Sequence, residues 1–234
     1  MIYRIIAVSL FFLTSFSEIN PSQFVKKSPL KSEFTNPDSE KSAYFALNTN
    51  SFKIPSFECF SKALIGFIKL KKLGDIQNDF LTIVDYSLPS TVKRLWVINT
   101  KENKIVINSL VAHGKNSGDN YANSFSNKNE SHKSSLGFFI TGETYIGKHG
   151  LSLRLDGLEK GINDGARKRS IVMHAADYVS EVFIKTHNRL GLSHGCPALP
   201  VNLNAKIIST IKGKSCLFIY YPCVDYNKTT KLIS

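Results

Sequence analysis

A short glycine-containing stretch near the C-terminus carries the residue types of a nucleophilic enzyme. Residues 191–199 read GLSHGCPAL. Ser193 and Gly195 are small enough for a tight turn, and Gly195 lets the backbone approach a ligand closely. Cys196 follows this turn, where backbone N–H groups can stabilise an oxyanion and a nearby imidazole can lower the pKa of a thiol. The pattern predicts a cysteine nucleophile, and the alternative from spacing alone is a disulfide partner in a glycine turn.

A nucleophilic cysteine needs a base, and the chain has six histidines. His194 lies two residues before Cys196, whereas His174 lies further upstream at the end of the apolar stretch SIVMH. Spacing alone leaves these two candidates equal. The remaining four are predicted to be solvated loop imidazoles: His113, His132, His149 and His187.

No metal centre is predicted. The chain has no HExxH motif, and its four cysteines lack the close spacing of a zinc finger. In an exported protein these cysteines could instead form two disulfides. They are Cys59, Cys196, Cys216 and Cys223.

The elements that position these residues are mostly strands. Apolar residues at steps of three and four predict an amphipathic helix that begins after Ser56 and ends before Gly74. From Leu81 the apolar period changes to two, which predicts strands over residues 81–86, 92–98, 104–112, 137–141, 150–155, 170–174 and 215–221, with a turn at 99–103. A second helix is expected over residues 201–213. The chain is therefore predicted to be mostly β with a few helices, as a sandwich or a partly open barrel.

Residues 116–135 are rich in Asn and Ser and show no periodicity. A connection of this length is usually functional or mobile. A lid that faces the substrate and a solvated surface excursion are equally compatible with this composition.

The N-terminus has the layout of a secretory signal peptide. Arg4 is the only charge in residues 1–17, the run IIAVSLFFLTSF follows, and Ser15 and Ser17 fit a cleavage site. The run is too short for an ordinary membrane span, and the alternatives are an uncleaved anchor or a buried strand. We divide the chain into a signal peptide (1–17), a flexible arm or linker (18–52), a catalytic domain (53–226) and a C-terminal tail (227–234).

The net charge of the full chain is +12, which predicts attraction to polyanions without identifying one. The basic residues are scattered, and no combined aromatic and basic motif is present. Nucleic-acid binding is therefore not predicted.

Six segments in order resemble the YkuD-type L,D-transpeptidases, the bacterial cysteine enzymes that cross-link the cell wall. The resemblance is closest to the murein L,D-transpeptidase catalytic-domain-like proteins and covers roughly residues 57–221. The segments are LTIVDYSLPSTVKRLWVI, LVAHGKNSG, FSNKNESHKSSLGFF, TYIGKHGLSLRLDGL, RSIVMHAADYV and SHGCPALP. The resemblance implies a YkuD-like β-rich domain, acyl transfer on peptidoglycan stem peptides, and no metal or organic cofactor.

By matching position, the resemblance implies that Cys196 is the nucleophile and that His174 is its base. His194 and the turn formed by Ser193 and Gly195 would lie near the oxyanion. In relatives the base is often oriented by a backbone carbonyl or a hydroxyl close after the His, and here Ala175 offers only its carbonyl.

This chain departs from the family at the substrate side. Ala198 stands where many relatives have Arg or Asn, so another cation must meet the carboxylate of the stem peptide. Leu192 and Ala175 also replace the usual Arg and Gly of the subgroup, which leaves substrate preference open. We name Arg154 and Arg169 as the carboxylate-binding candidates, with Arg167 and Arg189 behind them.

The expected protein is an exported, periplasmic or wall-associated acyltransferase with no membrane span after signal cleavage. Its alternatives are an L,D-carboxypeptidase or other cysteine peptidase of the wall, and a peptidoglycan-binding protein without catalysis. The sequence defines neither the acyl acceptor nor the oligomeric state.

Overall fold

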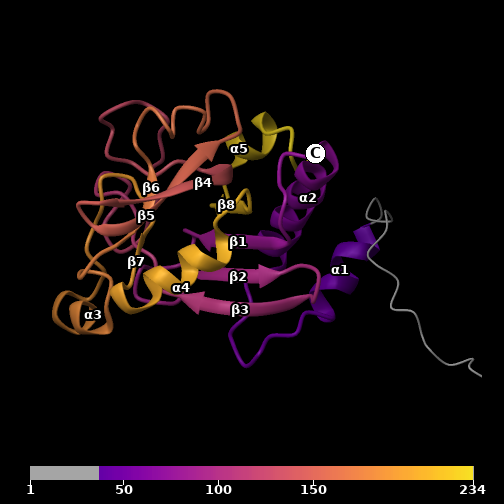
Figure 1. Ribbon diagram of the computed structural model, residues 1–234, viewed down its shortest axis with the longest axis horizontal. Helices are drawn as coiled ribbons and strands as arrows, with labels where there is room; N and C mark the ends of the chain where they lie inside the picture. The colour runs from indigo at the N-terminus through magenta and orange to yellow at the C-terminus, as the bar shows by residue number, and fades with distance from the viewer. Residues whose placement is uncertain (1–36, 234) are drawn as a thin grey trace, which may run out of the picture. The chain divides into compact units, whose positions relative to one another are not determined.

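The computed structural model describes residues 37–233, which form one mixed β-sheet with helices around it (Figure 1). The strands in this part of the chain are β1 (Phe80–Asp85), β2 (Leu95–Asn99), β3 (Lys104–Ser109), β4 (Gly137–Gly147), β5 (Gly150–Gly157), β6 (Val172–Ala175), β7 (Ala198–Leu199) and β8 (Cys216–Tyr220). The helices are α1 (Pro37–Phe45), α2 (Phe57–Leu73), α3 (Glu181–His187), α4 (Val201–Ile211) and α5 (Val224–Thr229). The prediction of a mostly β domain with a few helices is confirmed. The predicted signal peptide and the first part of the arm lie outside the described residues.

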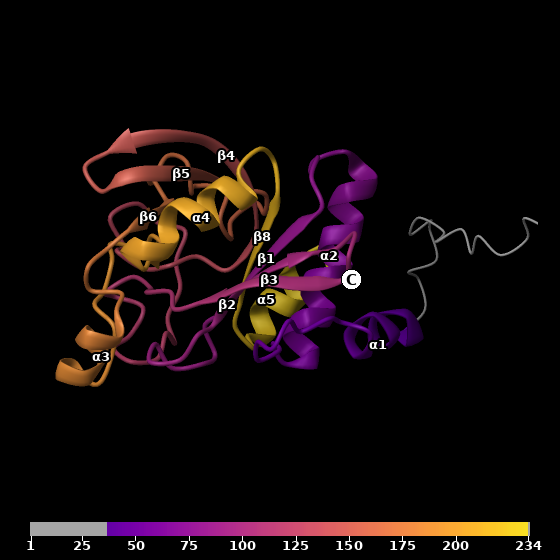
Figure 2. The same ribbon diagram turned by 60° about the horizontal axis from the view of Figure 1, so that its bottom comes forward.

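The sheet has the order β3-β2-β1-β8-β4-β5-β6-β7, with parallel pairs only at β1–β8 and β6–β7 among the described strands. Helix α2 packs against β1 and β8, and helix α4 contacts β1, β5 and β6. Figure 2 shows that the β4–β5 hairpin curves over α4, away from β1, β2 and β3. Strands β6 and β7 end the sheet on the side opposite β3, and the chemistry-bearing residues gather at that end.

Helix α2 forms where the apolar spacing predicts it. The Ser56 side chain caps its first turn by accepting a hydrogen bond from the Cys59 N–H, and Gly74 ends it in the left-handed conformation with φ 80°. Its buried face includes Phe60 and Phe67. Gly66 is required on that face because a Cβ there would lie 2.0 Å from the ring of Phe138.

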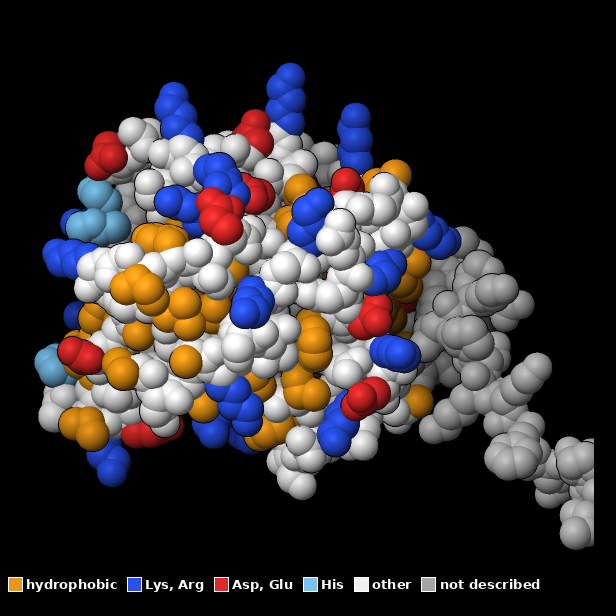
Figure 3. All heavy atoms as spheres, viewed as in Figure 1, with side chains coloured by type: hydrophobic (Ala, Val, Ile, Leu, Met, Phe, Trp, Pro, Cys, Tyr) orange, Lys and Arg blue, Asp and Glu red, His pale blue; other side chains and the backbone are white. Residues whose placement is uncertain are grey.

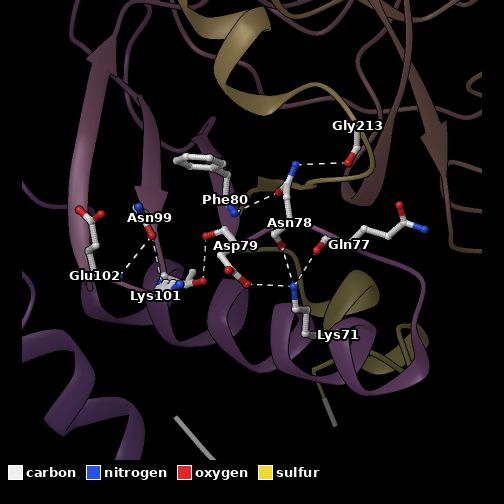
Figure 4. Close-up of polar contacts among 10 residues, drawn as sticks. Lys71, Gln77, Asn78, Asp79, Phe80, Asn99, Lys101, Glu102 and Gly213 are labelled. Atoms are coloured by element: carbon white, nitrogen blue, oxygen red, sulfur yellow. Dashed lines mark hydrogen bonds and ion pairs between the residues drawn. The ribbon is translucent and has the colours of Figure 1, made fainter. Parts of the chain in front are cut away.

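The end of α2 is tied to the start of β1 by a polar cluster (Figure 4). Lys71 Nζ lies 2.9 Å from Asp79 Oδ1 and also donates to two backbone carbonyls of the connection. The Asn78 side chain donates to the Gly213 carbonyl at 3.3 Å, which joins this connection to the segment before β8. Nearby, Asn99 Oδ1 accepts two backbone N–H groups of the β2–β3 turn, so the predicted turn at 99–103 is confirmed.

The second part of the predicted flexible arm is ordered. Residues 37–45 form α1, and Asn48 bridges to Lys104 beside β3. Tyr44 donates to the Pro55 carbonyl at 2.9 Å and packs on Phe60 at 5.4 Å between ring centroids, while Leu47 is buried. Apolar residues of this part, including Leu47 and Phe52, pack on the core although they show no sustained period in the sequence. A flexible arm is therefore expected only before residue 37.

The predicted boundary of the C-terminal tail falls inside α5. Buried Glu159 holds the residues after this boundary against the domain. Its carboxylate accepts from the Phe138 N–H at 2.7 Å, from the Tyr226 hydroxyl at 3.1 Å and from the Thr230 hydroxyl. The ordered domain therefore extends past residue 226.

A protein that begins at residue 53 is expected to be less stable than one that begins at residue 37. The longer form keeps the buried side chain of Leu47 and the contacts of Tyr44, and burial of one such side chain is worth about 1.5–3 kcal/mol. We expect a difference of about 2–4 kcal/mol in the free energy of unfolding, measured by urea denaturation. Equal stabilities would contradict the structural role of residues 37–52.

Within residues 37–233, no helix has the length and apolar character needed to cross a membrane.

Candidate active site

The turn that presents Cys196 is closed by the side chain of Ser193. The Ser193 hydroxyl donates to the Cys196 carbonyl at 2.6 Å and accepts the Gly195 N–H at 3.0 Å. Gly195 has φ 118°, and a Cβ at this position would lie 2.8 Å from the Lys133 carbonyl. Only glycine fits this conformation and this close approach. The predicted small-residue turn is thus present.

The hydrogen bond within the turn uses one of the two expected oxyanion donors. The Gly195 N–H points to Ser193 Oγ, whereas the Cys196 N–H has no hydrogen-bond acceptor among the described residues. An oxyanion that forms beside the sulfur would therefore find the Cys196 N–H available. The assignment of these roles stays a prediction.

The thiol of Cys196 lies beside strand β6. The Val172 N–H donates to Cys196 Sγ at 3.5 Å, and the sulfur lies 3.8 Å from the Ser170 carbonyl. Burial raises the pKa of this thiol, and the Val172 N–H and the charge of Arg169 offset only part of that effect. The resting group is therefore the protonated thiol.

All four cysteines are free, so the structure contains neither a disulfide at Cys196 nor the two bridges considered from the sequence. Cys59 and Cys216 are fully buried, on α2 and β8. Burial raises the pKa of both thiols, which makes them poor nucleophiles.

His174 lies on β6, next to the strand that follows the turn. Strands β6 and β7 pair in parallel with His174 opposite Ala198, which is two residues after Cys196. His174 Nδ1 lies 2.9 Å from the Ala175 carbonyl. Because a carbonyl only accepts, Nδ1 carries the proton and Nε2 is the basic nitrogen of the neutral ring.

The pKa of His174 is lowered. Burial is the main cause, the charge of His149 adds to it, and the Ala175 carbonyl opposes it. The imidazole is therefore neutral at pH 7 and can accept a proton. The Ala175 carbonyl lies where the resemblance placed the orienting group.

His194 lies in the turn itself and is exposed. Its ring lies against that of His132, with 4.5 Å between the centroids. Its pKa is lowered by slight burial and by the neighbouring charges of Lys115 and His132. Within residues 37–233 the ring contact of His194 is with His132, so its predicted oxyanion role stays a prediction.

One of the other histidines is not a solvated imidazole, because His113 is fully buried. His149 is exposed in the turn between β4 and β5 as predicted, and its ring stacks on that of His174 with 4.5 Å between the ring centroids. His187 is exposed as predicted, but it lies at the end of α3 and not in a loop, and it stacks on Phe183. The burial of His113 and the stack of His149 depend on contacts between segments distant in sequence, which spacing does not reveal.

The Asn- and Ser-rich segment 116–135 packs behind the cysteine turn. The Ser134 hydroxyl donates to the Gly195 carbonyl at 3.2 Å and accepts the Gly114 N–H, while its backbone N–H donates to the Ser117 hydroxyl. Ser117 and Ser134 are both fully buried. This part of the segment supports the turn and is not a solvated excursion.

The predicted carboxylate-binding arginines already have protein partners. Arg169 donates to the Ser126 and Lys133 carbonyls and to the hydroxyls of Ser131 and Ser135, which fastens segment 116–135. The other three candidates contact acidic residues, with Arg154 and Arg167 at Glu143, Arg167 also at Asp156, and Arg189 at Asp119. Substrate binding by Arg154 or Arg169 stays a prediction.

A buried arginine, Arg94, supports the cysteine turn through His113. Arg94 is completely buried and donates to the Leu88 carbonyl at 2.7 Å, to the Val111 carbonyl at 3.0 Å and to His113 Nδ1 at 2.7 Å. The ring of Tyr86 lies 4.9 Å from its guanidinium carbon. The His113 carbonyl in turn accepts the Ser193 N–H at 2.9 Å, so this cluster fixes the start of the cysteine turn.

This arrangement requires a neutral His113. Burial and the charge of Arg94 lower the pKa of His113 to about 4. The unfolded chain therefore binds this proton more readily than the folded one. We expect the free energy of unfolding to fall as the pH decreases from about 6.5 to about 4, by roughly 2–3 kcal/mol from this group.

The variant His113→Asn isolates this effect in urea denaturation over the same pH range. Because it removes the titrating group, it should lose less stability between pH 6.5 and 4 than the unmodified protein does. A pH slope equal to that of the unmodified protein would show that other groups cause the acid sensitivity.

Among residues 37–233, no group of three or more metal-ligating side chains is found.

The family comparison matches most of the chain. The model described as the L,D-transpeptidase catalytic domain matches residues 53–220 of the 234. No curated protein sequence matches.

Several solved structures are similar to this chain. An L,D-transpeptidase from Mycobacterium smegmatis is 12% identical with a TM-score of 0.38, and the match covers 61% of this chain and 59% of that one. The helical cell shape determining protein Pgp2 from Campylobacter jejuni is 17% identical with a TM-score of 0.39, and the match covers 71% of this chain and 56% of that one. An L,D-transpeptidase from Stackebrandtia nassauensis is 13% identical with a TM-score of 0.37, and the match covers 69% of this chain and 65% of that one. The chain thus spans less than two thirds of the length of each of these structures.

Proposed function

The chain belongs to the family of L,D-transpeptidase catalytic domains. We propose that it transfers acyl groups of peptidoglycan stem peptides through a thioester on Cys196. The observation that carries this proposal is the placement of the Cys196 thiol beside β6, the strand that bears His174. The Nδ1–H of that base is held by the Ala175 carbonyl, which leaves Nε2 to accept a proton.

The first half-reaction acylates the enzyme. His174 Nε2 accepts the thiol proton as the sulfur bonds to the carbonyl carbon of the L,D-bond in a tetrapeptide stem. The Cys196 N–H stabilises the negative charge on the carbonyl oxygen. When the C–N bond breaks, the proton passes from His174 to the departing nitrogen, and D-Ala leaves.

The second half-reaction regenerates the thiol. An amine attacks the thioester carbonyl, gives its proton to His174 and forms a new amide, and the sulfur leaves and is reprotonated. With a diaminopimelate side chain as the amine, the product is a 3–3 cross-link. With water as the acceptor, the thioester is hydrolysed and the protein acts as an L,D-carboxypeptidase. This is the second candidate activity.

Export belongs to this proposal because the wall lies outside the cytoplasm. We expect residues 1–17 to be removed as a signal peptide, so the mature protein isolated from its host should begin at Glu18. On the face drawn in Figure 3, Lys and Arg side chains project at separate places with Asp and Glu among them. The net charge, +12 for the full chain and +11 after removal of the segment that contains Arg4, therefore attracts an anionic polymer diffusely, without one concentrated patch on that face.

The test is intact-protein mass spectrometry after incubation with a disaccharide tetrapeptide, followed by product analysis. An acyl adduct mapped to Cys196, together with a cross-linked dimer or an exchanged terminal D-amino acid, is the expected result. An adduct with only tripeptide product would identify the carboxypeptidase. A folded protein with reduced Cys196 that gives neither adduct nor product would contradict the proposal and favour a binding role.

A further inference from the structure

The ring of His149, which takes no part in the proposed acyl transfer, lies against the ring of the proposed base. The centroids of His149 and His174 are 4.5 Å apart and the ring planes differ by 27°, so the two imidazoles stack face to face. His149 is exposed, whereas only 5% of His174 is exposed. The contact therefore covers the base with a residue from another element.

The β4–β5 hairpin brings His149 to this place. Lys148 and His149 form its two-residue tip between the paired residues Gly147 and Gly150, and Gly150 takes the left-handed conformation with φ 73°. A register shift between Thr141 and Thr144 bends the hairpin. Because β5 also pairs with β6, the tip returns over the strand that carries His174.

A hydrogen bond and a ring stack hold the His174 ring. Its edge is fixed by the hydrogen bond from Nδ1 to the Ala175 carbonyl, at 2.9 Å. The hydrogen bond alone permits the ring to tilt about the N–H···O direction, and a flat ring stacked on the face restricts that tilt. The direction of Nε2 depends on both.

We propose that His149 is a positioning residue, which holds the plane of the His174 imidazole and shields it from water so that Nε2 stays directed toward the acyl-transfer site. This inference rests on the proposed function for its role in catalysis. A misplacement of about 1 Å in a reacting group costs on the order of a hundredfold in rate. The restraint therefore has an effect large enough to measure.

The charge of His149 acts on the same base. It lowers the pKa of His174, in addition to burial. An uncharged aromatic ring at position 149 would keep the stack and remove this charge. The other titratable and charged groups that act on each other around the site are Cys196, Arg169, whose charge acts on the Cys196 thiol, and Tyr178, whose pKa the Cys196 charge helps to raise.

The experiment compares His149→Ala, His149→Phe and the matched control Lys148→Ala in the full mature chain. Two readouts are needed: kcat and KM with a disaccharide tetrapeptide, and the rate of Cys196 alkylation by iodoacetamide between pH 5 and 9. The alkylation readout needs only the thiol and its base, so it is independent of the natural substrate. Urea denaturation checks that each variant is folded.

We expect His149→Ala to lower kcat by roughly tenfold to a hundredfold, with KM within about twofold, and to slow alkylation at pH 7. His149→Phe should restore both rates to within about threefold, because it keeps the stack. As the pH is lowered, alkylation of His149→Phe should begin to slow at a higher pH than alkylation of the unmodified protein does. The reason is that the pKa of His174 rises when the charge of His149 is removed. Lys148→Ala should behave as the unmodified protein.

The inference is overturned if His149→Ala matches Lys148→Ala, or if folded His149→Phe is as impaired as His149→Ala. If the unmodified protein does not act on the stem peptide but its alkylation shows the pattern above, the inference is supported and only the proposed substrate fails. If alkylation is insensitive to position 149, the inference fails whatever the substrate.

Discussion

Replacing Cys196 with serine is expected to abolish the acyl adduct and to lower the rate of transfer by at least about a thousandfold. A hydroxyl is a weaker nucleophile than a thiol, and the neighbouring base has a lowered pKa, so it is poorly suited to activating an alcohol. The side chains are nearly the same size, and within residues 37–233 the sulfur hydrogen-bonds with only the Val172 N–H and the Ser170 carbonyl. The variant should therefore fold normally, and the loss should appear in intact mass spectra and in product analysis.

Cys223→Ser is the matched control for this variant. Cys223 is a free, partly exposed thiol just before α5. Its replacement should leave the adduct and the rate within about twofold of those of the unmodified protein. A Cys196→Ser protein that keeps near-normal transfer, or a loss confined to Cys223→Ser, would remove Cys196 from the nucleophile's role.

The parts of the fold that were predictable are those whose residues carry a period. Helix α2 follows from its three-and-four spacing with Ser56 and Gly74 at its ends, and the alternating runs gave the central strands. Helices α1, α3 and α5 were missed because each is short, and the two-residue strand β7 has no pattern of its own. The parallel pairing of β6 with β7 depends on the curvature of the whole sheet, which no local pattern encodes.

The candidate site shows the same division. The tight turn at Ser193 and Gly195 was predictable because small residues and a positive φ belong together. The raised pKa of the Cys196 thiol was not, because it depends on burial by segments distant in the chain. The same holds for the stack of His149 on His174 and for the contact of Arg94 with His113, each of which joins residues from separate elements.

Replacing His174 with alanine is expected to lower kcat at pH 7 by roughly a hundredfold to ten-thousandfold. The raised pKa of Cys196 leaves the resting thiol protonated, so the reaction depends on a base to remove the proton during attack. In the unmodified protein the base acts in its neutral form. Because the pKa of His174 lies below 6.5, activity should persist below pH 6.5 and decline only as the pH falls through the lowered pKa.

The pH profile distinguishes loss of this base from loss of structure. In His174→Ala, alkylation of Cys196 should be slow at neutral pH and rise only above about pH 9, where the thiol ionises without assistance. His187→Ala is the control, because His187 is exposed on α3 and stacks only on Phe183. Normal transfer in His174→Ala together with loss in His194→Ala would instead make His194 the base, which would require its exposed ring to leave His132 and turn toward the thiol.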